Sequence, residues 1–128
     1  MRDINSIIKS DSTVQVPSAG VYTLAAGTYY AELEQRGIEK GAHVSTQWVW
    51  DGNLVATLDV EISNFRDATS YGATLWQSTN VAQISVNASA GGVVSDLLNL
   101  AAARVRWKIV VATQGMLQGA ENAKAVAP

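Results

Sequence analysis

The sequence predicts an all-β protein, an antiparallel β-sandwich of jelly-roll type with about seven to nine strands. Three observations lead to this class. Apolar residues recur at every second position in several segments, Gly-containing turns separate these segments, and no segment keeps a helical period beyond a turn or two. With 128 residues, 48% of them apolar, the chain is large enough for one domain with its own core. We expect a single β-sandwich domain at residues 13–128, preceded by an N-terminal arm at residues 1–12.

The N-terminal arm holds three isoleucines, Ile4, Ile7 and Ile8, at helical spacing, but the stretch is too short to form a stable helix by itself. Arg2 and Lys9 flank these apolar residues with positive charge. Two interpretations of the arm remain open. Either it reaches a neighbouring molecule with the isoleucines as apolar anchors, or it is a tail that becomes ordered only on contact with another molecule.

Four segments place apolar residues at every second position, which is typical of antiparallel strands with one buried and one solvated face. They are residues 28–36, 54–62, 81–88 and 104–111. The residues predicted to face inward are Tyr29, Ala31, Leu33, Leu54, Ala56, Leu58, Val60, Ile62, Ala82, Ile84, Val86, Ala88, Val105, Trp107, Ile109 and Val111. Tyr30, between two of these positions, is predicted to face outward.

A hairpin is expected between a strand at residues 43–50 and the strand that starts at Leu54. The connecting residues are Asp51, Gly52 and Asn53. An Asp-Gly pair supplies the positive backbone angles that a tight hairpin turn needs. This turn is the strongest local prediction in the chain.

Three of the four tryptophans fall on predicted inward faces, and Trp76 alone is free for another role. Trp76 lies in a long irregular connection at residues 63–80 that also carries Phe65 and Tyr71. Because loops on a rigid scaffold often present recognition residues, Tyr71, Trp76 and the polar Gln77 form a candidate platform for a glycan. The alternative is that these aromatic side chains cap the open end of the core. The three inward tryptophans are Trp48, Trp50 and Trp107.

Arg104, Arg106 and Lys108 alternate along one strand, so all three lie on its polar face. One interpretation pairs this basic stripe with carboxylates on a neighbouring strand of the same chain. The other has it meet an acidic surface on a partner molecule. The net charge of −2 argues against a nucleic-acid binder, which needs a clear positive excess. The candidate internal carboxylates are Glu32, Glu34, Asp59 and Glu61.

Residues that could support catalysis are scarce. The chain has no cysteine, and no nucleophile motif or orienting carboxylate can be assigned to its one histidine, His43. It contains neither a calcium-binding loop nor a phosphate-binding motif, so we expect no metal, no cofactor and no enzymatic activity. No apolar run approaches the roughly 18 residues of a membrane span, and the first residues lack the apolar stretch of a secretory signal.

Three segments together carry a resemblance to a protein family. Residues 20–32 read GVYTLAAGTYYAE, a Trp-rich hairpin follows around Asp51, and residues 100–108 read LAAARVRWK. In these segments the chain resembles small structural proteins of tailed bacteriophages, several of which are capsid decoration or cement proteins with β-sandwich or jelly-roll folds. The resemblance implies a virion protein of the capsid surface that is assembled in the host cytoplasm.

The function that the resemblance implies is mechanical. Such a protein binds where subunits of the major capsid protein meet and stabilises the shell, with many copies multiplying modest contacts. Symmetry then predicts a homo-oligomer, either a trimer or a dimer. An alternative is a glycan- or host-surface-binding module of a phage tail fibre that uses the Trp76 platform. The residues that we expect to bind the capsid partner are Arg2, Ile4, Ile7, Ile8, Lys9, Arg104, Arg106 and Lys108.

Overall fold

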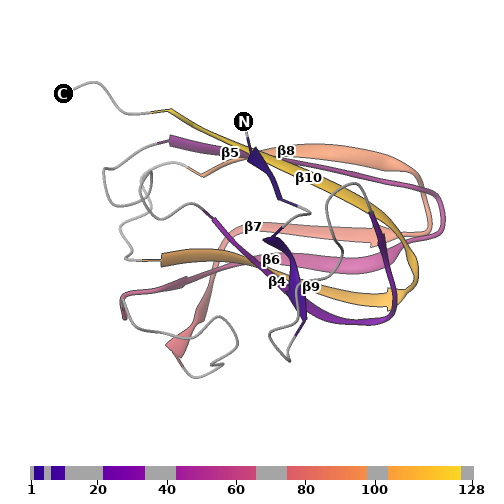
Figure 1. Cartoon of the computed structure of the whole chain (residues 1–128), viewed down its shortest axis with the longest axis horizontal. Coiled ribbons are helices and arrows are strands. Elements are labelled where there is room, and N and C mark those ends of the chain that lie inside the picture. The colour runs from indigo at the N-terminus through magenta and orange to yellow at the C-terminus, as the bar shows by residue number, and fades with distance from the viewer. Residues whose placement is uncertain are drawn as a thin grey trace.

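The structure, a computed structural model, describes residues 2–4, 7–10, 22–33, 43–65, 75–97 and 104–124. Within these residues, ten strands form two sheets in which every strand pair is antiparallel (Figure 1). Seven of these strands have six residues or more, and three have two. The predicted all-β antiparallel sandwich is thereby confirmed. Glu34 and Tyr71 lie outside the described residues.

The first sheet has the order β1-β10-β5-β8, and β3 pairs with the same edge of β10 as β1. Eight residue pairs join β10 to β5, and seven join β5 to β8 without a register shift. We call this layer the β5 sheet. Its strands are β1 (Arg2–Asp3), β3 (Thr23–Leu24), β5 (His43–Trp50), β8 (Gly91–Leu97) and β10 (Gly115–Lys124).

The second sheet has the order β2-β4-β9-β6-β7, and we call it the β9 sheet. Its register is regular from β4 to β9 and shifts between Asp59 and Glu61 where β6 meets β7. At that point Asp59 lies opposite Gln83 while Glu61 lies opposite Ser78, so β7 carries extra residues. The strands are β2 (Lys9–Ser10), β4 (Gly27–Glu32), β6 (Val55–Ser63), β7 (Gln77–Asn87) and β9 (Arg104–Thr113).

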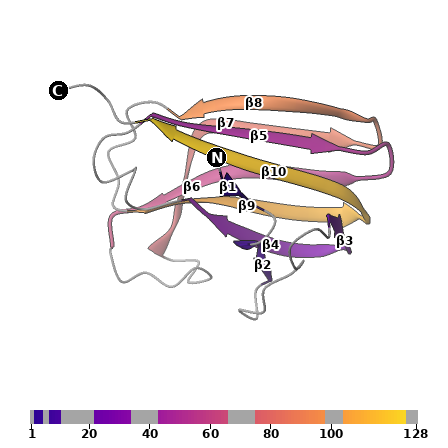
Figure 2. The same cartoon turned by 45° about the horizontal axis from the view of Figure 1, so that its top comes forward.

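The chain passes from one sheet to the other twice on the same side of the sandwich. β1 pairs with β10 and the following β2 pairs with β4, while β3 pairs with β10 and the following β4 pairs with β9 (Figure 2). The first passage is held by the Ile4 N–H, which donates to the Gly119 carbonyl at 2.9 Å. The second ends at Gly27, the first residue of β4, whose φ of 154° suits glycine. This side of the sandwich is therefore closed by the chain itself.

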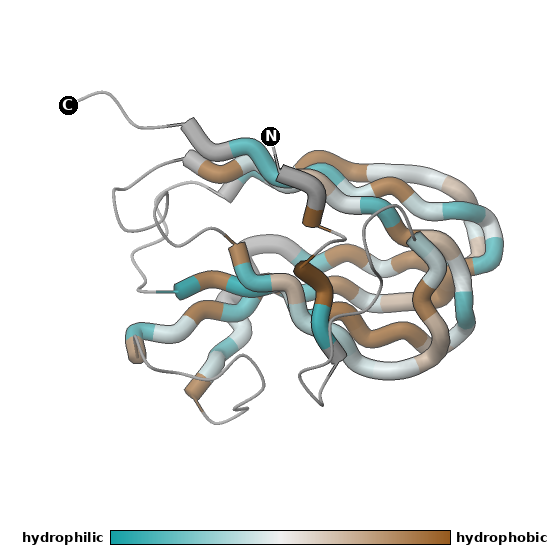
Figure 3. Tube along the Cα trace, in the orientation of Figure 1, coloured by the Kyte–Doolittle hydropathy of each residue, from teal (hydrophilic) through white to brown (hydrophobic). Residues whose placement is uncertain are grey.

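Hydrophobic and hydrophilic residues alternate along the strands (Figure 3). The apolar ones bury their side chains in the core between the sheets, as the period of two predicts. Trp48 from the β5 sheet and Trp107 from the β9 sheet meet edge to face at the centre, with ring centroids 5.8 Å apart. The Trp107 indole N–H also donates to the Thr46 hydroxyl at 3.4 Å. Because a Cβ on Gly119 would lie 2.3 Å from the Trp48 ring, glycine is required opposite Trp48.

Three local predictions need correction. Ala88 does not face inward; it is exposed at the β7–β8 turn with φ 52°, and its N–H donates to the Leu54 carbonyl at 2.9 Å. Tyr30 does not face solvent, because an arginine covers its ring and leaves the residue 7% exposed. The predicted hairpin at Asp51 is wrong: a turn forms there, but β5 pairs with β8 and β10 while β6 pairs with β7 and β9, so the turn joins two different sheets. Gly52 does not adopt a positive φ in it.

What holds that turn is the carboxylate of Asp51. It accepts hydrogen bonds from the N–H groups of Asn53 at 3.1 Å and Leu54 at 3.2 Å. Trp50, just before the turn, is half-buried, and its indole N–H donates to the Ser89 carbonyl at 2.8 Å. The turn that leads from the β5 sheet to the β9 sheet is thus fixed by side-chain acceptors and donors rather than by glycine geometry.

Candidate functional site: the two outer faces of the sandwich

The outer face of the β9 sheet carries the basic stripe together with the carboxylates of its neighbours. The Arg104 side chain forms a two-point ion pair with Glu32, in which Nε donates to Oε2 at 2.7 Å. Arg106 Nε donates to Glu61 Oε1 at 2.8 Å, and Nη2 of the same arginine lies 2.7 Å from that oxygen. Pairing within the chain is therefore the arrangement that the structure contains for both arginines.

Trp76 covers both arginines on the outer face of the β9 sheet. The Arg106 guanidinium carbon lies 3.9 Å from the ring centroid of Tyr30 and 4.3 Å from that of Trp76, and Arg104 lies 5.2 Å from the Trp76 centroid. Cation–π contact of this kind is strongest where water is excluded. Arg106 is 1% exposed and Trp76 is 2% exposed. The prediction of a free, exposed Trp76 ring is therefore wrong, and this tryptophan is not available as a glycan platform in the structure.

Lys108, the third member of the basic stripe, is half-buried. The register places it directly opposite Tyr30 of β4 and Asp59 of β6. The whole stripe is thus flanked on both sides by strands of its own sheet, so it does not present a row of three open positive charges. Sequence reasoning placed these residues on one face but could not place Trp76 over them.

The residues of the N-terminal arm are also committed within the chain. Ile4 and Ile8 are fully buried in the core, and Ile7 is partly buried against it. These side chains therefore anchor the chain's own two sheets and are not available to a neighbouring molecule. Lys9 is exposed on β2, and Arg2 lies opposite Glu121 in the β1–β10 register.

The outer face of the β5 sheet differs in composition. Asp96 is its one charged residue among the side chains that the structure describes, and the register also places Asp3 and Lys124 on this face. Large apolar side chains on it reach solvent. Val49 is 43% exposed, Val94 is 56% exposed and Met116 is 46% exposed. No motif predicted this surface, although alternation along residues 43–50 puts Val49 on the face opposite Val44 and Trp48. The outward residues are Ser45, Gln47, Val49, Gly92, Val94, Asp96, Met116, Gln118, Ala120 and Asn122.

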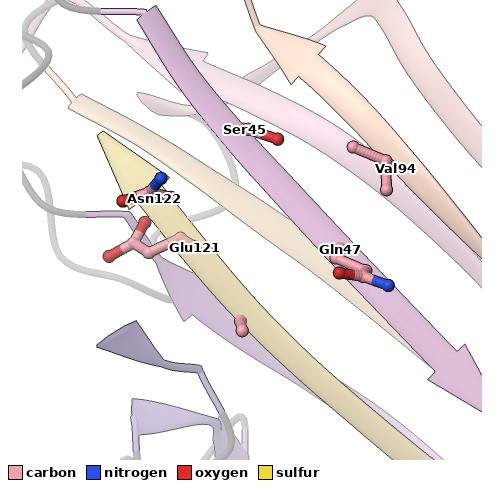
Figure 4. Close-up of a pocket in the computed structure, with 6 residues that line it drawn as sticks. Ser45, Gln47, Val94, Glu121 and Asn122 are labelled. Carbon is pink, nitrogen blue, oxygen red and sulfur yellow. The ribbon is translucent and has the colours of Figure 1, made fainter. Parts of the chain in front are cut away.

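Two shallow hollows mark this face. One, of about 280 Å³, lies across β8, β5 and β10 and is lined by hydroxyl, amide, carboxylate and apolar groups (Figure 4). The other, of about 190 Å³, lies beside the Asp51 turn and is bounded by Val49, Trp50 and Met116. The side chains lining the larger hollow are Ser45, Gln47, Val94, Ala120, Glu121 and Asn122.

A third hollow, of about 200 Å³, lies where β6 ends and β7 begins. Phe65, 61% exposed, and Leu75, 36% exposed, stand beside the amides of Asn64 and Gln77. Gln77 is a residue of the predicted glycan platform, and the structure places it next to Phe65. An exposed aromatic ring in a polar connection was the available signal for this hollow.

The described residues hold no cluster of three or more histidine, cysteine, aspartate or glutamate side chains that could bind a metal ion. In that same part of the chain, no helix is long and apolar enough to cross a membrane. No protein-family model matches the chain, and a search of curated protein sequences finds no significant relative.

Proposed function

We propose that this protein is a structural, non-enzymatic component of a bacteriophage virion, which decorates the capsid by docking its β5 sheet onto the major capsid protein. The observation that carries the proposal is the outer face of that sheet. Three large apolar side chains, Val49, Val94 and Met116, reach solvent there, and the register places no charged residue at the facing positions 47, 49, 92, 94, 118 and 120 around them. Apolar surface of this kind, with few charges at its centre, is typical of protein–protein contacts.

The opposite face does not offer an equivalent contact. Its arginines are held by Glu32 and Glu61, and Trp76 covers Arg106. A partner would have to break these ion pairs in order to use the charges, at the cost of leaving partly buried carboxylates without their partners. The basic stripe therefore supports the fold, and the β5 sheet is the face left for a partner.

The choice of a capsid as the partner rests on the resemblance of residues 20–32 and 100–108 to phage structural proteins. The fold is compatible with it, since a rigid sandwich presents a flat sheet that can lie on a shell surface. Many copies on one shell would multiply a modest affinity per contact. This role places the protein on the outside of the virion, where it would stabilise contacts between capsid subunits.

Cosedimentation with undecorated capsids of the phage that encodes the chain tests the proposal. Val49→Lys places a charge at the centre of the docking face, and we expect it to lower capsid binding by on the order of tenfold or more. Val110→Lys is the matched control, because Val110 is 39% exposed on the outer face of the β9 sheet. Failure of the unaltered protein to bind capsids, or equal loss in both variants, would refute docking through the β5 sheet.

The hollow beside Phe65 favours a second candidate, a glycan-binding module of a tail fibre. Phe65 offers an exposed ring, and Asn64 and Gln77 offer amide groups beside it. Bacterial surface polysaccharide should then bind the protein, and Phe65→Ala should abolish that binding while Val110→Ala leaves it unchanged. Absence of polysaccharide binding in isothermal titration removes this candidate.

A further inference from the structure

β8 forms one end of the β5 sheet, and no described strand pairs with its outer edge. It is seven residues long, with the sequence GGVVSDL, and it keeps a continuous register with β5 along its whole length. Val93 is 36% exposed and Val94 is 56% exposed, so side chains on both faces of the strand reach solvent. An open, regular and nearly uncharged edge of this length can accept another strand.

The other three sheet edges show the features by which monomeric proteins prevent such pairing. The edge of β10 is covered by β1 and β3, and the edge of β4 by β2, all of which have two residues. β2 also carries the exposed Lys9. β7 is interrupted by the register shift opposite Asp59 and Glu61. Short strands, edge lysines and bulges all discourage edge-to-edge contact, and β8 has none of them.

We propose that β8 pairs with β8 of a second copy of this chain, in antiparallel orientation about a two-fold axis at Val94. The β5 sheets of the two copies then form one continuous sheet. This inference goes beyond the proposed function, because the dimer would form with or without a capsid.

The sequence of β8 is self-complementary in this register. Val94 meets Val94 on the outer face, and Val93 lies opposite Ser95 on the inner face. The single charge of the strand, Asp96, lies opposite Gly92, so that no like charges face each other across the axis. An unrelated extended peptide would have no reason to match this pattern, which is why we assign the edge to a second copy.

Sedimentation equilibrium of the full-length protein tests the dimer. We expect a mass of twice the 13.6 kDa of the chain at micromolar concentrations. Val94→Lys brings two ammonium groups together at the axis and should raise the dimer dissociation constant by on the order of tenfold or more. Val49→Lys, on the same face but on β5, should leave the dimer intact. A monomer at all concentrations up to about 100 µM, or a Val94→Lys dimer as tight as the unaltered one, overturns the proposal.

Disulfide trapping tests the register. The chain contains no cysteine, so a single introduced thiol reports on one contact. Paired Cα atoms in an antiparallel ladder lie about 4.5–5.5 Å apart, which is within the range of about 4.4–6.8 Å that a disulfide spans. Val94→Cys should therefore give a covalent dimer under mild oxidation, while Val49→Cys should not. Equal rates of cross-linking in the two variants contradict the proposed axis.

The two proposals fail separately. Loss of capsid binding in Val49→Lys with the dimer retained supports both of them. A monomeric protein that still binds capsids overturns the β8 pairing and leaves the docking face in place. A dimer that binds no capsid overturns the docking proposal and leaves the β8 pairing in place.

Discussion

The two outer faces of this sandwich are made from strands of similar length. Other parts of the chain cover the outer face of the β9 sheet, whereas the outer face of the β5 sheet is exposed. On the β9 sheet, Arg106 and Trp76 are almost fully buried although they lie outside the core. On the β5 sheet, Val49 and Val94 are exposed although they are apolar. Polarity alone therefore does not tell which face of a strand is covered. What decides it is whether another segment of the chain lies above that face.

The comparison also explains why charge is a poor guide to the partner surface in this protein. The arginines are the most conspicuous residues in the sequence, but carboxylates on adjacent strands neutralise them. Glu61 lies directly opposite Arg106, and Glu32 lies two positions from Arg104 in the register. On the outer face of the β5 sheet, Val49 and Val94 are exposed and carry no charge. Such apolar side chains can lose water to a partner without breaking an ion pair of their own.

The largest expected effect comes from removing a buried side chain on the outer face of the β9 sheet. Arg106→Ala leaves the Glu61 carboxylate without its buried partner and removes the guanidinium that supports Tyr30 and Trp76. We expect the free energy of unfolding to fall by about 3–5 kcal/mol, measured by urea denaturation. Gln47→Ala, on the outer face of the β5 sheet, should change it by less than about 0.5 kcal/mol. Similar losses in both variants would show that the two faces do not differ in this way.

A smaller effect is expected on the inner face of the β5 sheet, where Trp48 packs on Gly119. Gly119→Ala places a methyl group 2.3 Å from a ring carbon of Trp48, so the ring or the β10 backbone must move. Overpacking of this kind costs about 1–3 kcal/mol. Thermal unfolding and the near-ultraviolet circular dichroism of the tryptophans should both report it. Ala120→Gly, at the next position of β10, is the control for a change of backbone on the outer side.

The smallest expected effect concerns the Asp51 turn, which joins the two sheets. Desolvation opposes ionisation of Asp51, but hydrogen bonds from the N–H groups of Asn53, Met116 and Leu54 and from the Asn53 side chain together outweigh it and lower the pKa of the Asp51 carboxyl below 3.8. Because the folded-state pKa is the lower one, this contribution to stability is present above about pH 4 and is lost as pH falls through the folded-state pKa. Asp51→Asn should therefore be less sensitive to acid than the unaltered protein between pH 4 and pH 2, measured by urea denaturation. An unchanged pH dependence would show that the carboxylate does not hold the turn.

Much of the architecture follows from local pattern. Alternation at Leu54, Ala56, Leu58 and Val60 placed these residues inward, and all four are buried. A turn at Asp51 was predicted from two residues, and it forms, because the aspartate side chain can accept neighbouring N–H groups in almost any context. The predicted pairing of the two strands that flank it is absent, because they belong to different sheets. Such features depend on residues close in sequence, so they need no knowledge of the rest of the fold.

The covering of each surface depended on contacts between residues far apart in the chain. Trp76 covers Arg106, which is thirty positions later in the sequence, and Ile4 and Ile8 enter a core built mainly from later strands. The sequence showed an apolar arm and a tryptophan without an assigned role, but it did not show which residues they contact. Period-two patterning states which side chains share a face. Only the packing of the sheets, arm and connections decides which faces are buried, because that depends on strand order and register, which alternation does not encode.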